Sequence, residues 1–139
     1  MSNDEITIEA LVEAPVERVW LRWTAPDHIT QWNFASDDWC CPSAENDLTP
    51  GGRYRARMEA RDRSFGFDFE AVYDEIAEHE KLIYTMTDGR RVSTVFKVEG
   101  GATRVKTTFD ADKENPVEMQ RQGWQAILNN FKSYAEEST

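Results

Sequence analysis

Two carboxylates stand between two tryptophans in the segment 32–42. Asp37 and Asp38 are flanked by Trp32 and Trp39. Aromatic walls with a few polar groups are the usual composition of a small-molecule site, so this segment could form the mouth of a pocket. If burial separated the pKa values of the two carboxyl groups, Asp37 or Asp38 could also act as a general acid or base. The alternative is that both carboxylates cap turns while the tryptophans close one end of the core.

Other residues that could carry chemistry are few. His28 and His79 are the only histidines, and both are expected at the surface. The Cα atoms of the adjacent Cys40 and Cys41 lie about 3.8 Å apart, too close for the usual disulfide span of about 4.4 to 6.8 Å, so free thiols are expected. The cysteines and His28 could supply three metal ligands, but no second cysteine pair supports this, and we expect neither metal nor cofactor. No nucleophile elbow, phosphate loop or dinucleotide motif occurs, which favours a binding protein over an enzyme.

Composition narrows the possible partners. The chain has 139 residues, enough for one domain over 1–139, and its net charge is −10 at pH 7. The electrostatic field of this net negative charge repels phosphate backbones and anionic lipid surfaces. No run of about 18 apolar residues is present, and the N-terminus has acids where a signal peptide has bases. We expect a cytoplasmic protein, monomeric or weakly dimeric, that neither binds nucleic acid nor inserts into membranes.

Hydrophobic periodicity predicts the order of elements. Residues 6–12 read as a strand, and residues 16–23 carry apolar side chains at helical spacing after Pro15. A second short helix is expected from Pro26, and residues 33–50, which have no sustained period, are expected to form a long connection. Five more strands are predicted, giving an antiparallel meander of about six: 53–59, 67–73, 82–87, 92–98 and 103–109.

The first two strands of this group specify their own register. Charged and apolar residues alternate in both, so one register places opposite charges on the wet face and apolar groups inside. In that register the numbers of facing residues sum to 125, which pairs Arg57 with Asp68, Arg55 with Glu70, and Met58 with Phe67.

A long helix with an interrupted apolar stripe ends the chain. Asn115 is predicted as its N-cap and Pro116 as its first residue. Gln120 and Gly123 stand where large apolar residues would continue the stripe, and a glycine within a helix costs about 1 kcal/mol relative to alanine. Either they leave space under the helix or Gly123 packs against a bulky neighbour. The remaining stripe residues are Val117, Trp124, Ile127, Leu128, Phe131 and Tyr134.

Several segments together resemble one protein family. They are A-P-V-E-R-V-W (14–20), P-G-G-R-Y (50–54), G-F-D-F-E-A-V-Y-D-E-I (66–76), Y-T-M-T-D-G-R (84–90) and N-P-V-E-M-Q-R-Q-G-W-Q-A-I-L-N-N-F (115–131). The chain is similar over residues 6–136 to the SRPBCC superfamily, and within it to the activator of Hsp90 ATPase homolog 1-like branch.

The resemblance implies an α+β helix-grip fold of the START and Bet v 1 type, with a curved antiparallel sheet wrapped on the C-terminal helix and two short helices after the first strand. It also implies a cavity under that helix that binds apolar or aromatic molecules, lipid-like or polyketide- or flavonoid-like. The co-chaperone in the family's label has a separate domain that grips the chaperone, and 139 residues do not accommodate it, so interaction with Hsp90 is not expected.

The expected function is therefore binding of a hydrophobic or aromatic small molecule. Two alternatives remain: a cyclase- or hydrolase-type enzyme that uses Asp37 or Asp38, and a chaperone-linked interaction module of the stress response. Gln120 is expected to orient the ligand by hydrogen bonding. The inward positions predict that the cavity is lined by Trp20, Trp32, Trp39, Tyr54, Met58, Phe67, Phe69, Tyr84, Met86, Phe96, Gln120 and Trp124.

Overall fold

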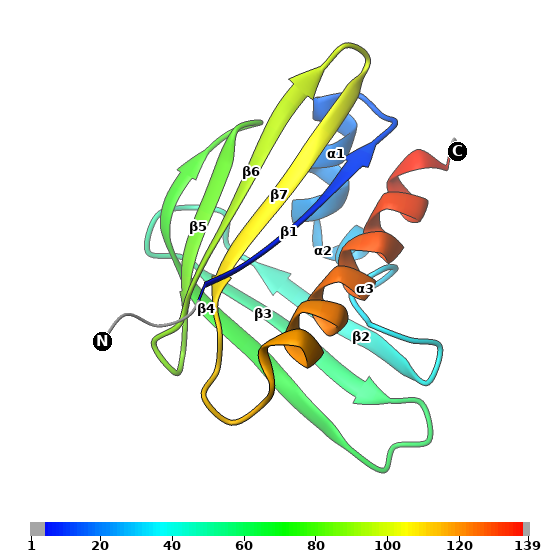
Figure 1. Ribbon diagram of the computed structural model, residues 1–139, viewed down its shortest axis with the longest axis vertical. Coiled ribbons are helices and arrows are strands. Elements are labelled where there is room, and N and C mark those ends of the chain that lie inside the picture. The colour runs from blue at the N-terminus through cyan, green and yellow to red at the C-terminus, as the bar shows by residue number, and fades with distance from the viewer. Residues whose placement is uncertain (1–4, 138–139) are drawn as a thin grey trace.

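A strongly curved antiparallel sheet and one long helix dominate the structure (Figure 1), a computed structural model that describes residues 5–137. The predicted domain, 1–139, includes residues 1–4 and 138–139, which lie outside the described residues. The elements follow in the order β1 (Glu5–Val12), α1 (Val16–Thr24), α2 (Pro26–Ile29), β2 (Trp39–Asn46), β3 (Arg53–Ala60), β4 (Gly66–Ala77), β5 (Lys81–Met86), β6 (Arg91–Glu99), β7 (Ala102–Asp110) and α3 (Val117–Glu136).

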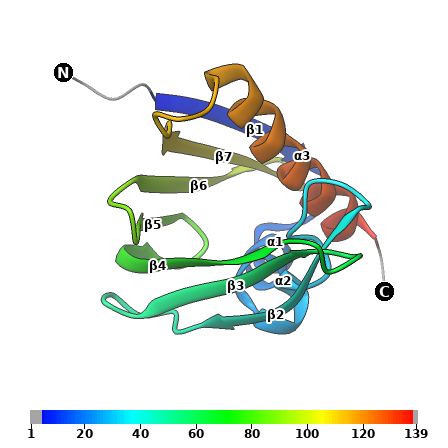
Figure 2. The same ribbon diagram turned by 90° about the horizontal axis from the view of Figure 1, so that it is seen from below.

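The sheet curls into a half-barrel. Its strand order is β1-β7-β6-β5-β4-β3-β2, and every neighbouring pair is antiparallel. Figure 2 shows β1, β7 and β6 on one side and β4, β3 and β2 on the other, with β5 between them. The helix α3 lies along β1, α2 lies against β2, and α1 packs against α2 and α3 and contacts β6 and β7. This is the predicted α+β helix-grip fold.

The strand count differs from the expectation of about six, because β2 lies inside the expected connection 33–50. This strand pairs with β3, but its register shifts between Cys40 and Ser43. Pro42 stands within that irregularity, where a proline is tolerated because it sits at an edge and donates no ladder hydrogen bond. The shift breaks the period-two pattern that identifies a strand, so the prediction of a continuous connection was wrong.

The helix α3 covers the free edge of β1 with side-chain hydrogen bonds. Arg121, Gln125 and Lys132 donate to the backbone carbonyls of alternate β1 residues. The acceptors are Thr7 (3.0 Å), Glu9 (3.3 Å) and Leu11 (2.8 Å). An exposed strand edge would otherwise present these carbonyls to another chain, so the helix both fills the concave side and protects the edge.

The predicted register of the β3–β4 hairpin is confirmed. Arg57 faces Asp68, Arg55 faces Glu70 and Met58 faces Phe67. The ion pairs are partly diagonal, since Asp68 contacts both Arg57 (3.5 Å) and Arg55 (3.4 Å). Glu70 pairs instead with Arg53.

The start of α3 differs from the predicted cap. The helix begins at Val117 with Pro116 as its N-cap, and no side chain caps it. The Asn115 amide instead donates to Asp112 (3.2 Å to Oδ2), which holds the β7–α3 loop. Val117 is 36% exposed, so the buried part of the stripe starts later. Across residues 5–137, the structure contains no helix with the length and apolar character needed to span a bilayer.

Candidate functional site

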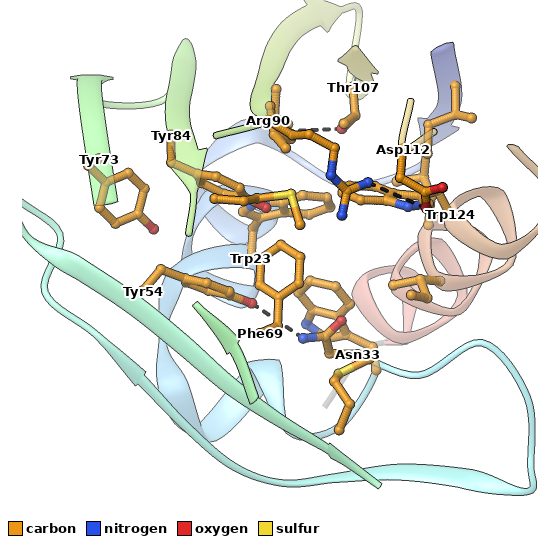
Figure 3. Close-up of a pocket in the computed structure, with 18 of the residues that line it drawn as sticks. Trp23, Asn33, Tyr54, Phe69, Tyr73, Tyr84, Arg90, Thr107, Asp112 and Trp124 are labelled. Atoms are coloured by element: carbon orange, nitrogen blue, oxygen red, sulfur yellow. Dashed lines mark hydrogen bonds and ion pairs between the residues drawn. The ribbon is translucent and has the colours of Figure 1, made fainter. Parts of the chain in front are cut away.

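A cavity of about 270 Å³ lies between the sheet and α3 (Figure 3). Nineteen side chains line it, and fourteen of them are aromatic or aliphatic. Eight of the twelve residues predicted to line it are among them: Trp32, Tyr54, Met58, Phe67, Phe69, Tyr84, Met86 and Trp124. The inward positions of β3, β4 and β5 were therefore placed correctly in space.

Three of the other predicted aromatic residues pack elsewhere. Trp20 and Phe96 meet edge to face, with ring centroids 5.4 Å apart, inside the core under α1. Trp39 lies at the sheet edge against Phe65 and Phe67, with centroids 5.9 and 6.1 Å away. None of the three borders the cavity.

Gln120 has a structural role in place of the predicted ligand-orienting one. Its side-chain oxygen accepts from the amide of Asp112 (2.8 Å), and its nitrogen donates to the carbonyls of Asp112 (3.2 Å) and Asn115 (2.8 Å). All of its hydrogen-bonding groups are thus engaged with the β7–α3 loop, and the residue does not line the cavity.

Asp37 and Asp38 are both exposed and lie outside the cavity. Their backbone carbonyls accept hydrogen bonds from Arg61, one from its side chain and one from its amide. The buried carboxylate pair that acid-base chemistry would need is therefore not formed by these residues.

Eleven lining residues were not among those predicted to line the cavity, although the predicted apolar stripe of α3 already included Ile127 and Leu128. Trp23 was assigned to the core stripe of α1, and the inward threonines of β6 and β7 look like wet-face residues in a sequence. The polar residues Asn33, Arg90 and Asp112 lie in loops, where strand alternation does not predict the direction of a side chain. The full set is Ile8, Trp23, Asn33, Tyr73, Arg90, Val92, Thr94, Thr107, Asp112, Ile127 and Leu128.

Stacked aromatic rings hold the cavity walls in place. Trp23 stacks on Trp32 with centroids 5.0 Å apart, and both meet the ring of Phe131 on α3 edge to face. On the other side Trp124 stacks on Phe109 of β7, with centroids 3.9 Å apart and planes 13° apart. Such pairs add about 0.5 to 1.5 kcal/mol beyond area burial, so contacts with α3 and β7 fix the rings of Trp23, Trp32 and Trp124 that border the cavity.

Three tyrosines form the polar side of the cavity. The Tyr73 hydroxyl donates to Asn46 Oδ1 (2.8 Å), and the Tyr54 hydroxyl accepts from Asn33 Nδ2 (3.3 Å). Burial raises the pKa of Tyr84 well above its ordinary value, and the neighbouring Tyr73 adds to this; burial likewise raises the pKa of Tyr54 and of Tyr73. All three side chains are therefore neutral hydroxyls near pH 7.

An ion pair between Arg90 and Asp112 also borders the cavity. Arg90 Nη1 lies 3.8 Å from Asp112 Oδ2, and both side chains are partly buried. Arg90 Nε also donates to Asp88 (2.8 Å). Gly89, with φ of +93°, allows the tight turn that brings Arg90 to this position. Desolvation raises the pKa of Asp112, but hydrogen bonds from Asn115 and Glu114 and the Arg90 charge outweigh it and hold that pKa below its usual value.

The two cysteines, Cys40 and Cys41, do not line the cavity. Burial, with a contribution from Cys40, raises the pKa of the Cys41 thiol to about 11, so this thiol is protonated and a weak nucleophile near neutral pH. Both cysteines are free. In residues 5–137 there is no cluster of three or more histidine, cysteine, aspartate or glutamate side chains placed to hold a metal ion.

A half-barrel that grips a helix over an aromatic cavity defines the helix-grip class, whose fold is generally a scaffold for binding small molecules. The chain belongs to the activator of Hsp90 ATPase homolog 1-like family, whose model matches residues 13–136.

Solved structures agree with this assignment. The AHSA1-like protein from Aeromonas hydrophila is 43% identical, with a TM-score of 0.90 over 96% of this chain and 92% of that one. The protein Chr148 from Cytophaga hutchinsonii is 46% identical, with a TM-score of 0.83 over 95% and 92% of the two chains. The protein CV1439 from Chromobacterium violaceum, 20% identical with a TM-score of 0.87 over 97% and 99%, shares the fold. The comparison with curated proteins finds no match.

Proposed function

We propose that this protein binds an apolar or aromatic small molecule in the cavity between the sheet and α3. The observation that carries the proposal is the cavity itself, about 270 Å³ of space bordered by eight aromatic side chains. Protein interiors are normally close-packed, with few voids larger than a water molecule, so a concave space of this size between the sheet and α3 supports a binding role. An aromatic lining with a few convergent polar groups is the usual composition of a ligand site.

The volume limits the size of the ligand. An apolar cavity of about 150 Å³ takes up benzene. The present cavity, at about 270 Å³, has room for a molecule of two fused rings. It lies just below the usual range for drug-sized ligands, roughly 300 to 1,000 Å³. A compact polyketide- or flavonoid-like fragment therefore fits better than a long-chain lipid.

The lining supports binding without a chemical step. Its two charged side chains, Arg90 and Asp112, face each other, and its three tyrosines are neutral hydroxyls near pH 7. The carboxylates considered for catalysis, Asp37 and Asp38, lie outside it. These groups can position a molecule, and general acid-base chemistry would need a titratable group poised near neutral pH.

The five tryptophans give a direct test. Trp23, Trp32 and Trp124 line the cavity, whereas Trp20 and Trp39 do not. Titration of the protein with naphthalene, followed by the indole N–H signals in NMR spectra, should shift the first three signals and leave the other two nearly unchanged. No shift at saturating naphthalene, or shifts confined to Trp20 and Trp39, would refute the proposal. Native mass spectrometry of protein purified from its own host would then identify the natural occupant.

A further inference from the structure

The hydroxyl of Tyr84 differs from the other hydroxyls that border the cavity. Thr94 and Thr107 bond to each other across β6 and β7, with 2.9 Å between their oxygens. Tyr73 donates to Asn46, and Tyr54 accepts from Asn33. Within residues 5–137, the Tyr84 hydroxyl makes no hydrogen bond.

This hydroxyl opens into the cavity. Tyr84 stands on β5, the middle strand of the half-barrel, and its side chain points inward between the two walls (Figure 3). In the described part of the chain, no polar side-chain atom is both fully buried and unpaired, so the Tyr84 oxygen must border accessible space. Because Tyr84 lines the cavity, that space is the cavity.

Neighbouring rings fix the direction of the hydroxyl. Tyr54 stacks on Tyr84 with centroids 5.8 Å and planes 9° apart. Tyr73 and Phe69 pack edge to face against the same ring, at 5.9 and 6.0 Å. A donor held in this way loses little conformational freedom when it bonds a ligand, which makes it an effective orienting group.

The charges of the lining disfavour an anionic ligand. Arg90 forms ion pairs with both Asp112 and Asp88, so two carboxylates already neutralise its positive charge. An anion brought into the cavity would find no uncompensated cation among the described lining residues, and burial of an unpaired charge is strongly unfavourable.

We propose that the ligand is an uncharged aromatic molecule with a hydrogen-bond acceptor, such as a ketone oxygen, that receives the hydrogen bond of the Tyr84 hydroxyl. The inference rests on the proposed function, because it assumes that the cavity is the binding site. It adds the chemical class of the ligand and the residue that selects it.

Two matched probes test this role. 2-Acetylnaphthalene carries the acceptor, and 2-isopropylnaphthalene has nearly the same shape without it. Calorimetric titration should show that Tyr84→Phe weakens binding of the ketone roughly three- to tenfold, the range of one hydrogen bond, and changes binding of the hydrocarbon less than about twofold. Tyr134→Phe removes a tyrosine hydroxyl that bonds His28 away from the cavity, and it should change neither affinity.

The outcomes separate the inference from the proposed function. If both probes bind and Tyr84→Phe affects them equally, the inference is wrong while the binding function stands. If neither neutral probe binds the wild type, the binding function fails and the inference fails with it. The wild type also provides a test without any variant: 2-naphthoate should bind at least tenfold more weakly than the ketone, and tighter binding of the anion would overturn the uncharged class.

Discussion

Arg90, in the β5–β6 turn, lies 3.8 Å from Asp112, in the β7–α3 loop, and this pair links the segment that enters the β6–β7 hairpin to the segment that leaves it. The carboxylate of Asp112 also accepts from the amides of Glu114 (3.0 Å) and Asn115 (2.9 Å). The loop that leads into α3 is therefore organised around one ionised group, which makes its stability dependent on pH.

Asp112→Asn should lower the free energy of unfolding by roughly 1 kcal/mol near neutral pH, the value of hydrogen bonds to a partly exposed charge. Hydrogen bonds and Arg90 hold the pKa of Asp112 below its unfolded value despite desolvation. Its stabilisation is thus complete above the unfolded pKa and is lost as pH falls through the folded pKa. Urea unfolding of both proteins at about pH 6 and about pH 2 should show the difference shrinking in acid. A difference that is the same at both values would contradict this account.

Gln120→Leu tests the structural role of the Gln120 amide. The substitution removes three hydrogen bonds to the β7–α3 loop, and we expect a loss of about 2 kcal/mol in the free energy of unfolding. Hydrogen exchange of the Asp112 amide should accelerate, because its acceptor is gone. Unchanged stability together with a tenfold loss of affinity for 2-acetylnaphthalene, and not for naphthalene, would instead support the ligand-orienting role.

The parts of the fold that the sequence predicted have regular patterns. Arg57 and Asp68 alternate with apolar neighbours on strands joined by a short turn, so only one register satisfies both faces. The strand β2 was missed because Pro42 and a register shift break its alternation. Strands with regular alternation of apolar and polar residues can be predicted from the sequence, whereas an irregular edge strand such as β2 lacks that pattern.

Within the strands, the alternation of inward and outward residues predicted several of the side chains that line the cavity; it made no prediction for the loops. Tyr54 and Tyr84 were found because inward positions on neighbouring strands must share one space. Arg90 and Asp112 were not, because they lie just beyond the strand ends at the open end of the β6–β7 hairpin, where the Val92–Phe109 register brings them together but strand alternation no longer predicts which way a side chain points. Gln120 was placed on the correct helix face, but its polar partners belong to a loop whose path the sequence did not give.

Gly123→Ala should stabilise the protein by about 1 kcal/mol, because alanine is the better helix former. A Cβ at this position meets no heavy atom within 4 Å, which excludes close packing as the reason for the glycine. Gly52→Ala is the contrasting control, since its Cβ would lie 2.2 Å from the carbonyl oxygen of Asp47 and should destabilise the fold. Thermal unfolding measures both; a fall in melting temperature for Gly123→Ala would show an unrecognised constraint.

The hairpin charges can be tested by a double-mutant cycle. Arg57→Gln and Asp68→Asn should show a coupling free energy of roughly 0.2 to 1 kcal/mol in urea unfolding. Each single variant also removes a second ion pair, Asp68 with Arg55 (3.4 Å) or Arg57 with Glu59 (3.8 Å), so the two should cost similar amounts and the cycle is needed to isolate the Arg57–Asp68 term. Strictly additive effects would mean that the Arg57–Asp68 contact contributes nothing to stability.

The central claim is that the cavity under α3 is the binding site, and filling it is the most direct test. Met86 lines the cavity from β5, whereas Ile83 on the same strand does not. Naphthalene affinity should be measured by calorimetry for Met86→Trp and Ile83→Trp, with the fold of each verified by circular dichroism. We expect at least a tenfold loss for Met86→Trp and wild-type affinity for Ile83→Trp. Wild-type affinity in Met86→Trp, or equal loss in both variants, would contradict the claim.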